Sequence, residues 1–137
     1  MSLALSNALQ AAVYQRLSSH AVLQQLIGPA VFDQPPPGTD IPETFVMIGA
    51  ERVRDRSAVD ARASVHELEI VVETTEPRFA TAKAVAATVA EALEAPPLTL
   101  AQGHLVSIGF RSARARRLSG GQRRRIAMVF RAFVEDV

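Results

Sequence analysis

The sequence predicts an α+β fold in which helices cover one face of an antiparallel sheet of about four strands. Three observations favour this class. Apolar residues recur at helical spacing near the N-terminus and again in the middle of the chain. Residues 44–54 and 65–74 alternate in polarity, as strands do. The C-terminal quarter contains two further alternating segments, which predict a long hairpin.

The chain is expected to begin with two helices. A second, short helix ends at Gly28, since glycine is the usual residue after a helix. An extended piece at 30–32 follows, and the prolines within 35–42 predict a loop because they cannot donate ladder hydrogen bonds. The first helix spans 3–17, and its apolar stripe consists of Leu5, Leu9, Ala12, Val13 and Leu17.

The middle of the chain is expected to form two strands and a helix. Between the strands, residues 54–64 are polar and lack clear periodicity, which predicts a long, mobile connection. The helix begins near Pro77 and buries a stripe that ends at Leu93. The second strand turns apolar residues inward and an acidic row outward, namely Glu67, Glu69 and Glu73.

The predicted C-terminal hairpin consists of strands at 104–117 and 123–134 joined by a turn at Ser119-Gly120-Gly121. We expect its tip to be exposed and rich in arginine. The whole chain, residues 1–137, is expected to form a single domain, because 137 residues are one domain's worth. It has no cysteine and no apolar run of about 18 residues, so neither disulfides nor a membrane span is expected.

Charge divides unevenly along the chain. The net charge is +1, yet residues 103–137 contain eight arginines and two acids, whereas the rest of the chain is net acidic. Arginine suits bidentate pairing with carboxylate or phosphate. The C-terminal quarter is therefore expected to face either nucleic acid or an acidic protein surface.

The segment Leu118-Ser119-Gly120-Gly121-Gln122 spells the signature loop of transporter-type ATPases. In those proteins the loop opens a helix that faces a phosphate. Here the following residues alternate as a strand does, and the chain has no glycine-rich loop with a lysine for the phosphates. The sequence therefore predicts a hairpin turn and no nucleotide site.

Nothing in the sequence argues for an enzyme, a metal or a cofactor. The three histidines His20, His66 and His104 lie far apart and are expected to be ordinary surface or core residues. Asp55 and Asp60 lie among arginines, so we expect local ion pairs and no acid–base dyad.

Two sets of residues are candidate assembly sites. The acidic row of one subunit could meet the basic hairpin of the next in a head-to-tail ring, which is the favoured interpretation. The alternative is a small nucleic-acid-binding module that uses the hairpin for phosphate contacts. The basic set is Arg111, Arg114, Arg116, Arg117, Arg123, Arg124 and Arg125; the polar connection supplies a candidate docking loop with Arg54, Asp55, Arg56, Asp60 and Arg62.

The order of segments resembles a family of phage proteins. The resemblance rests on a helix ending at Leu17 and a short one ending at Leu26-Ile27-Gly28, then Val31-Phe32-Asp33, Pro35-Pro36-Pro37-Gly38, Ile41-Pro42, Phe45-Val46-Met47-Ile48-Gly49, His66 opening a strand, an alanine-rich helix to Leu93 and a last strand with Arg131. This pattern is similar to the tail-terminator, or tail-completion, proteins of long-tailed phages and gene transfer agents.

The resemblance implies a six-fold ring at the head-proximal end of the tail, assembled in the host cytoplasm and carried in the particle. Such a ring sits on the last ring of tail tube protein, stops polymerisation and joins a head-completion or connector protein. It leaves a lumen through which DNA passes without sequence-specific contact. The resemblance implies no catalysis, cofactor or membrane.

Overall fold

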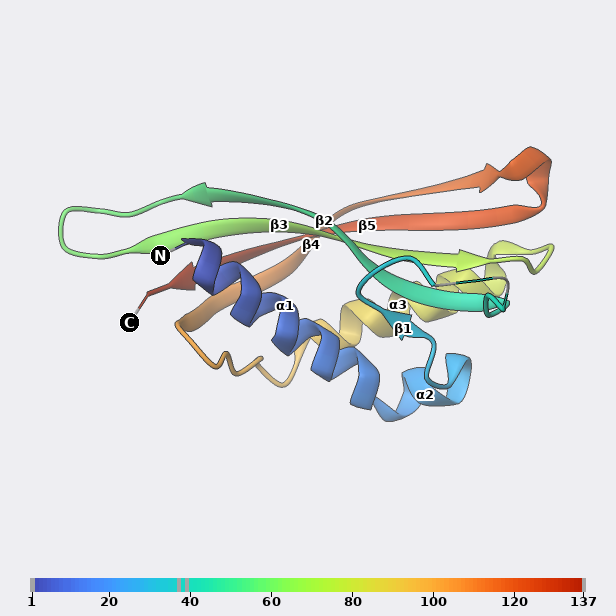
Figure 1. Ribbon diagram of the computed structural model, residues 1–137, viewed down its shortest axis with the longest axis horizontal. Helices are drawn as coiled ribbons and strands as arrows, with labels where there is room; N and C mark the ends of the chain where they lie inside the picture. The colour runs from blue at the N-terminus through green and yellow to red at the C-terminus, as the bar shows by residue number, and fades with distance from the viewer. Residues whose placement is uncertain (1, 37, 39, 137) are drawn as a thin grey trace.

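The computed structural model describes residues 2–36, 38 and 40–136, in which helices lie along one face of a long, twisted sheet (Figure 1). Pro37, in the proline loop, lies outside the described residues. The elements in chain order are α1 (Ser2–Ser19), α2 (Ala21–Ile27), β1 (Val31–Phe32), β2 (Thr44–Asp55), β3 (Ala63–Thr74), α3 (Phe79–Glu94), β4 (His104–Leu118), the 3₁₀ turn η1 (Ser119–Gly121) and β5 (Arg123–Glu135). The predicted α+β class and the long C-terminal hairpin are confirmed.

The sheet has five strands in the order β1-β2-β3-β5-β4, one more than the four expected. The additional strand is the extended piece at Val31–Phe32, which pairs in parallel with β2. All other pairings are antiparallel. β3 and β5 are therefore central, and β4 is a long strand at the edge.

The polar connection after β2 is shorter than the sequence predicts. β2 continues to Asp55 and β3 begins at Ala63, so only residues 56–62 lie between the strands. The Arg56 amide donates to the Ala63 carbonyl at 2.8 Å, and the Ala58 amide donates to the Ala61 carbonyl at 2.7 Å. Residues 54–62 are exposed, so this part of the hairpin has no buried face to impose the alternation that marks a strand.

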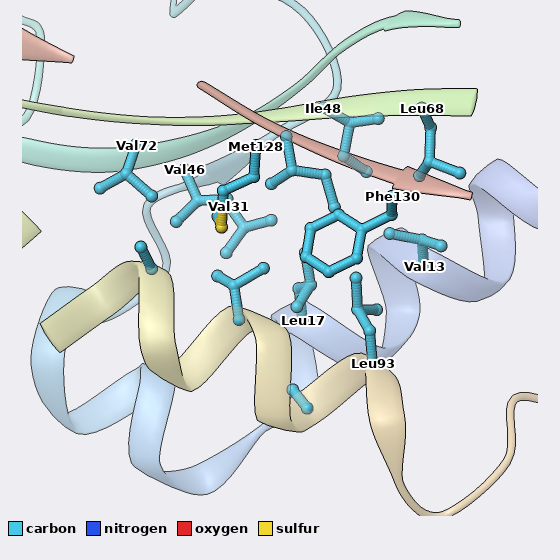
Figure 2. Packing of buried hydrophobic residues seen from close by; sticks show 14 of the residues in the cluster. Val13, Leu17, Val31, Val46, Ile48, Leu68, Val72, Leu93, Met128 and Phe130 are labelled. Carbon is cyan, nitrogen blue, oxygen red and sulfur yellow. The ribbon is translucent and has the colours of Figure 1, made fainter. Parts of the chain in front are cut away.

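The core lies between the helices and one face of the sheet (Figure 2). Leu5, Leu9, Val13 and Leu17 of α1 are at most 1% exposed, which confirms the predicted stripe, although Ala12 is only partly buried. The inward faces of β3 and β5 supply alternate residues such as Ile70, Met128 and Phe130. Burial of each such side chain stabilises the fold by about 1.5–3 kcal/mol.

Two phenylalanine rings in edge-to-face contact, one from β4 and one from β5, provide a test of this core. Phe130 is 1% exposed and meets the ring of Phe110, which is 54% exposed, edge to face at 5.9 Å. Phe130→Ala should lower the free energy of unfolding by about 3–5 kcal/mol, because it leaves a buried cavity. Phe110→Ala, the matched control, should cost about 1 kcal/mol. Equilibrium urea unfolding measures both, and equal losses would contradict the described core.

Candidate assembly surfaces

The C-terminal hairpin turns at residues whose backbone has positive φ. Ser119, Gly120 and Gly121 have φ values of 52°, 65° and 94°. Glycine adopts such angles without a Cβ clash, which explains the Gly-Gly pair. The strand β5 begins at Arg123 immediately afterwards. The Leu118–Gln122 motif is therefore a hairpin turn, as predicted, and opens no α-helix.

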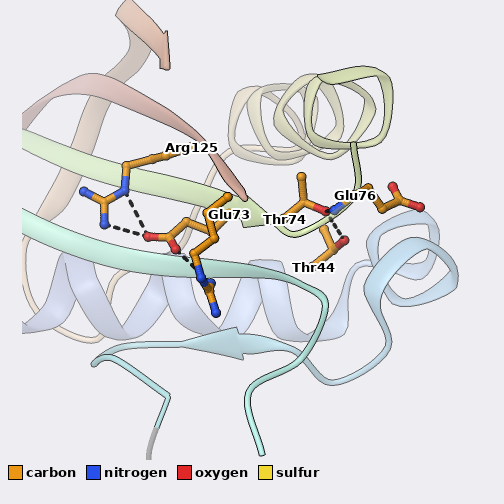
Figure 3. Close-up of polar contacts among 6 residues, drawn as sticks. Thr44, Glu73, Thr74, Glu76 and Arg125 are labelled. Atoms are coloured by element: carbon orange, nitrogen blue, oxygen red, sulfur yellow. Dashed lines mark hydrogen bonds and ion pairs between the residues drawn. The ribbon is translucent and has the colours of Figure 1, made fainter. Parts of the chain in front are cut away.

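The arginines at the start of β5 are held by their own chain (Figure 3). Arg125 donates to Oε2 of Glu73 from Nε at 2.9 Å and from Nη2 at 2.6 Å, and Arg123 Nη1 donates to Oε1 at 3.2 Å. Glu73 itself is only 7% exposed. Arg124 donates to the carbonyls of Gly121 and Glu76, at 3.2 and 3.4 Å.

These contacts correct the expectation of a fully exposed basic tip. Arg123, Arg124 and Arg125 are all half-buried, and the guanidinium of Arg124 lies 5.5 Å from the centre of the Phe79 ring. Sequence alternation indicated that Arg123 and Arg125 point away from the helices, but it could not show that Glu73 lies next to them. The guanidinium groups of these three arginines therefore form hydrogen bonds or ion pairs within their own chain.

The arginines of β4 differ from those of β5, because they are exposed. β4 has four arginines, and none of their guanidinium groups forms an ion pair within the part of the chain that the structure describes. The register places Arg114 opposite Ala127 and Arg116 opposite Arg125, on the sheet face away from the helices. The exposed set, called the β4 arginines below, consists of Arg111, Arg114, Arg116 and Arg117.

The acidic row of β3 lies beside arginines of the same sheet and forms no separate surface. The register pairs Glu73 with Arg125 and Glu67 with Arg131. Glu67 and Glu69 are half-buried. Two of the three acids of this row therefore lie directly opposite an arginine of the same subunit, whereas Glu69 lies opposite Val129.

The candidate docking loop lies at the end of the β2–β3 hairpin, which projects beyond the helices at one end of the molecule (Figure 1). Its five charged residues, Arg54, Asp55, Arg56, Asp60 and Arg62, are exposed. The expected ion pairs of Asp55 and Asp60 are absent among the described residues. Asp55 instead accepts a hydrogen bond from Ser57 Oγ at 2.7 Å.

A buried polar chain, which sequence reasoning missed, connects α1 with β2 and β3. Ser6 Oγ donates to Oε1 of Glu51, whose Oε2 accepts from Nδ1 of His66 at 3.0 Å, and Nε2 of His66 lies 2.7 Å from Ser64 Oγ. The spacing of Ser64 and His66 on one strand face was readable from the sequence. The position of Glu51 was not, because it depends on a bulge after Ile48.

The connectivity of Ser64, His66 and Glu51 is that of a hydrolase triad, but its setting is different. Ser64 and His66 are both 0% exposed, so a substrate carbonyl has no surface from which to reach the hydroxyl. His66 is thus a core histidine with two partners, in line with its sequence interpretation. Within the described residues, no group of three His, Asp or Glu could hold a metal, and no helix is long and apolar enough to cross a membrane.

Comparison with known proteins identifies the family. The family described as tail completion protein gp17 matches residues 11–135. The chain belongs to this tail completion family. A chain of the solved structure entitled "Virion of native gene transfer agent (GTA) particle" is 48% identical, with a TM-score of 0.90 over 98% of this chain and 99% of that one. Comparison with curated proteins finds no significant match.

As a tail completion protein, this chain has a structural role in a tail or virion-like particle and assembles with other particle proteins. The family assignment agrees with the resemblance expected from segment order. It also gives a reason to separate side chains that stabilise the subunit from those left free for a partner. Glu73 and its partners Arg123 and Arg125 belong to the first group, and the β4 arginines are candidates for the second.

The role of Glu73 can be tested by removing its charge alone. Glu73→Gln should lower the free energy of unfolding by about 1–3 kcal/mol, because it weakens charge-assisted bonds to two arginines. Glu67→Gln, on the same strand face, is the matched control and should change stability by less than about 1 kcal/mol. Urea unfolding measures both variants. A larger loss for Glu67→Gln would refute the assignment.

Proposed function

We propose that this tail completion protein forms a ring, expected to be a hexamer, that caps the head-proximal end of the tail tube. The ring ends tail polymerisation and forms part of the head–tail junction of a phage or gene transfer agent. The observation that carries the proposal is 48% identity, over nearly the whole of both chains, to a chain of a gene transfer agent virion.

The mechanism is steric and interfacial, with no catalysis and no cofactor. A bound ring covers the tube surfaces that would otherwise recruit another tube subunit, and its lumen leaves room for DNA. The 1–137 chain acts as one domain in this role. Its partners are other copies of itself, the tail tube protein and a head-completion or connector protein, with assembly in the host cytoplasm.

The β4 arginines are the charged surface most available to a partner. They lie on an edge strand and are exposed, and within the described residues no carboxylate pairs with them. A partner surface with carboxylates in register with β4 would pair with these side chains in bidentate fashion. The docking loop at residues 54–62 is the second proposed contact, at the opposite end of the sheet.

Reversal of two β4 charges tests the assembly role. Arg114→Glu with Arg116→Glu should leave the monomer folded, because both side chains are exposed and form no ion pair within the described residues, and substitutions at such sites change stability by about 0.5 kcal/mol or less. Assembly should fail, because like charges would face each other in every copy of the interface. Electron microscopy of particles should show tails of uncontrolled length or heads without tails.

The matched control is Arg52→Glu with Arg78→Glu, which makes the same charge change at exposed sites outside β4. The control should give particles with tails of normal length joined to heads. If the β4 variant also gave such particles, the assembly role of these arginines would be excluded. Circular dichroism and urea unfolding of the purified variants distinguish failed assembly from failed folding.

The second candidate function is nucleic-acid binding by the same β4 arginines, favoured by their exposure along one strand. If all four contacted phosphates, log K for duplex DNA would fall with log salt concentration with a slope of about −3 to −4. For a ring-forming protein we expect no measurable affinity of the free subunit at physiological salt. Fluorescence anisotropy with a labelled duplex decides between the two functions. Tight binding of the duplex with a steep salt dependence would favour the nucleic-acid module.

A further inference from the structure

An apolar groove runs along α3 where it faces the edge of the sheet. Two cavities, of about 410 and 70 Å³, adjoin each other there and share Ala90 and Phe110. Alanines form the α3 wall, including Ala87, and the floor includes Phe110, Ala113 and Met128. The groove exists because both walls carry small side chains. The chain itself leaves it open, and Phe110 stays 54% exposed.

The two ends of the groove carry opposite charges. Lys83 lines one end and Glu94 the other, both from α3. The eleven helical steps between them span about 16 Å. A segment that fills this groove should be apolar in its centre, with a carboxylate at one end for Lys83 and a cation at the other for Glu94.

The tip of the β2–β3 hairpin has this pattern. Its sequence is Arg56-Ser57-Ala58-Val59-Asp60, in which a base and an acid flank one serine and two apolar residues. The chain reverses at Val59 and Asp60, where the Ala58 amide donates to the Ala61 carbonyl at 2.7 Å, so Val59 lies at the outermost point of the hairpin. Val59 is fully exposed, at 108% of its reference area, and is the most exposed large apolar residue of the described chain.

The tip and the groove of one chain cannot meet each other. Figure 1 shows the β2–β3 hairpin projecting at one end of the long axis, whereas α3 and the turn of the β4–β5 hairpin lie toward the other end. A contact between them must therefore join two chains. A head-to-tail contact between these two different surfaces closes into a ring when the rotation permits.

We propose that Val59 of one subunit inserts into the α3–β4 groove of the next copy, with Asp60 beside Lys83 and Arg56 beside Glu94. This inference rests on the proposed ring. It assigns the docking loop to the neighbouring subunit, and it replaces the acidic row of β3 with Glu94 and Asp60 as the acids of the interface. The β4 arginines then stay free for a different partner.

The absence of cysteine from the sequence makes the contact testable by disulfide formation. Val59→Cys with Ala87→Cys, carried by the full chain in assembled particles, should give a ladder of disulfide-linked multimers on a non-reducing gel after mild oxidation. The matched control is Val59→Cys with Ala11→Cys, which moves the second thiol to the exposed side of α1. It should give at most trace dimers.

A charge exchange provides an independent measurement. Asp60→Lys and Lys83→Glu should each reduce the yield of tailed particles at least tenfold, and the double variant should restore most of it. Circular dichroism checks that each single variant folds, which is expected because both positions are exposed.

The outcomes separate this inference from the proposed ring. Multimers that another crosslinker detects in particles, without the disulfide ladder and without charge rescue, would overturn the groove contact and leave the ring intact. Disulfide adducts to a different particle protein would overturn the choice of a second copy. Tails of normal length in particles that lack this protein would overturn the proposed function itself.

Discussion

The buried polar side chains of β3 set the positions of the elements around it. This strand is paired on both sides along its whole length, and ten of its twelve residues are buried. A buried polar group without a partner is costly, so each must find one. His66 meets Glu51 of β2, Thr74 meets Thr44 of β2 at 2.8 Å, and Glu73 meets the arginines of β5.

These contacts favour one register of the sheet over its neighbours. A slip of one residue would move every side chain of β3 to the other face of the sheet. Glu73 would then point toward the helices, and the apolar residues that now face the helices would point away from them. The slip would also separate Glu73 from Arg125, which lies directly opposite it. Ser6 extends the same network to α1, through its bond to Glu51. The polar contacts therefore add specificity to a core whose stability comes mainly from aliphatic burial.

The sequence predicted the elements that bury one face, because burial of one face places apolar residues at a regular spacing along the chain. The α1 stripe and the alternation of β3 and β5 follow from this. The projecting end of the β2–β3 hairpin has no buried face, so no alternation marked it as a strand. β1 was expected only as an extended piece, because its two residues are too few to show a period. The bulge after Ile48 shifts the register between β2 and β3 and brings Glu51 to His66. Such a shift depends on the pairing of two strands and cannot be read from either one alone.

The sequence predicted which arginines make up the candidate site. It could not predict which of them are bonded within the subunit and which are left exposed. Fifty residues separate Glu73 from Arg123, so only the folded sheet reveals that β5 arginines are committed to the subunit and β4 arginines are not. That division also bears on solubility before assembly. A long edge strand invites pairing with other edges, and the exposed positive charges and two bulges of β4 oppose it. In the proposed assembly, a partner that supplies carboxylates would neutralise these charges, so the same arginines would oppose pairing between like edges and favour pairing with that partner.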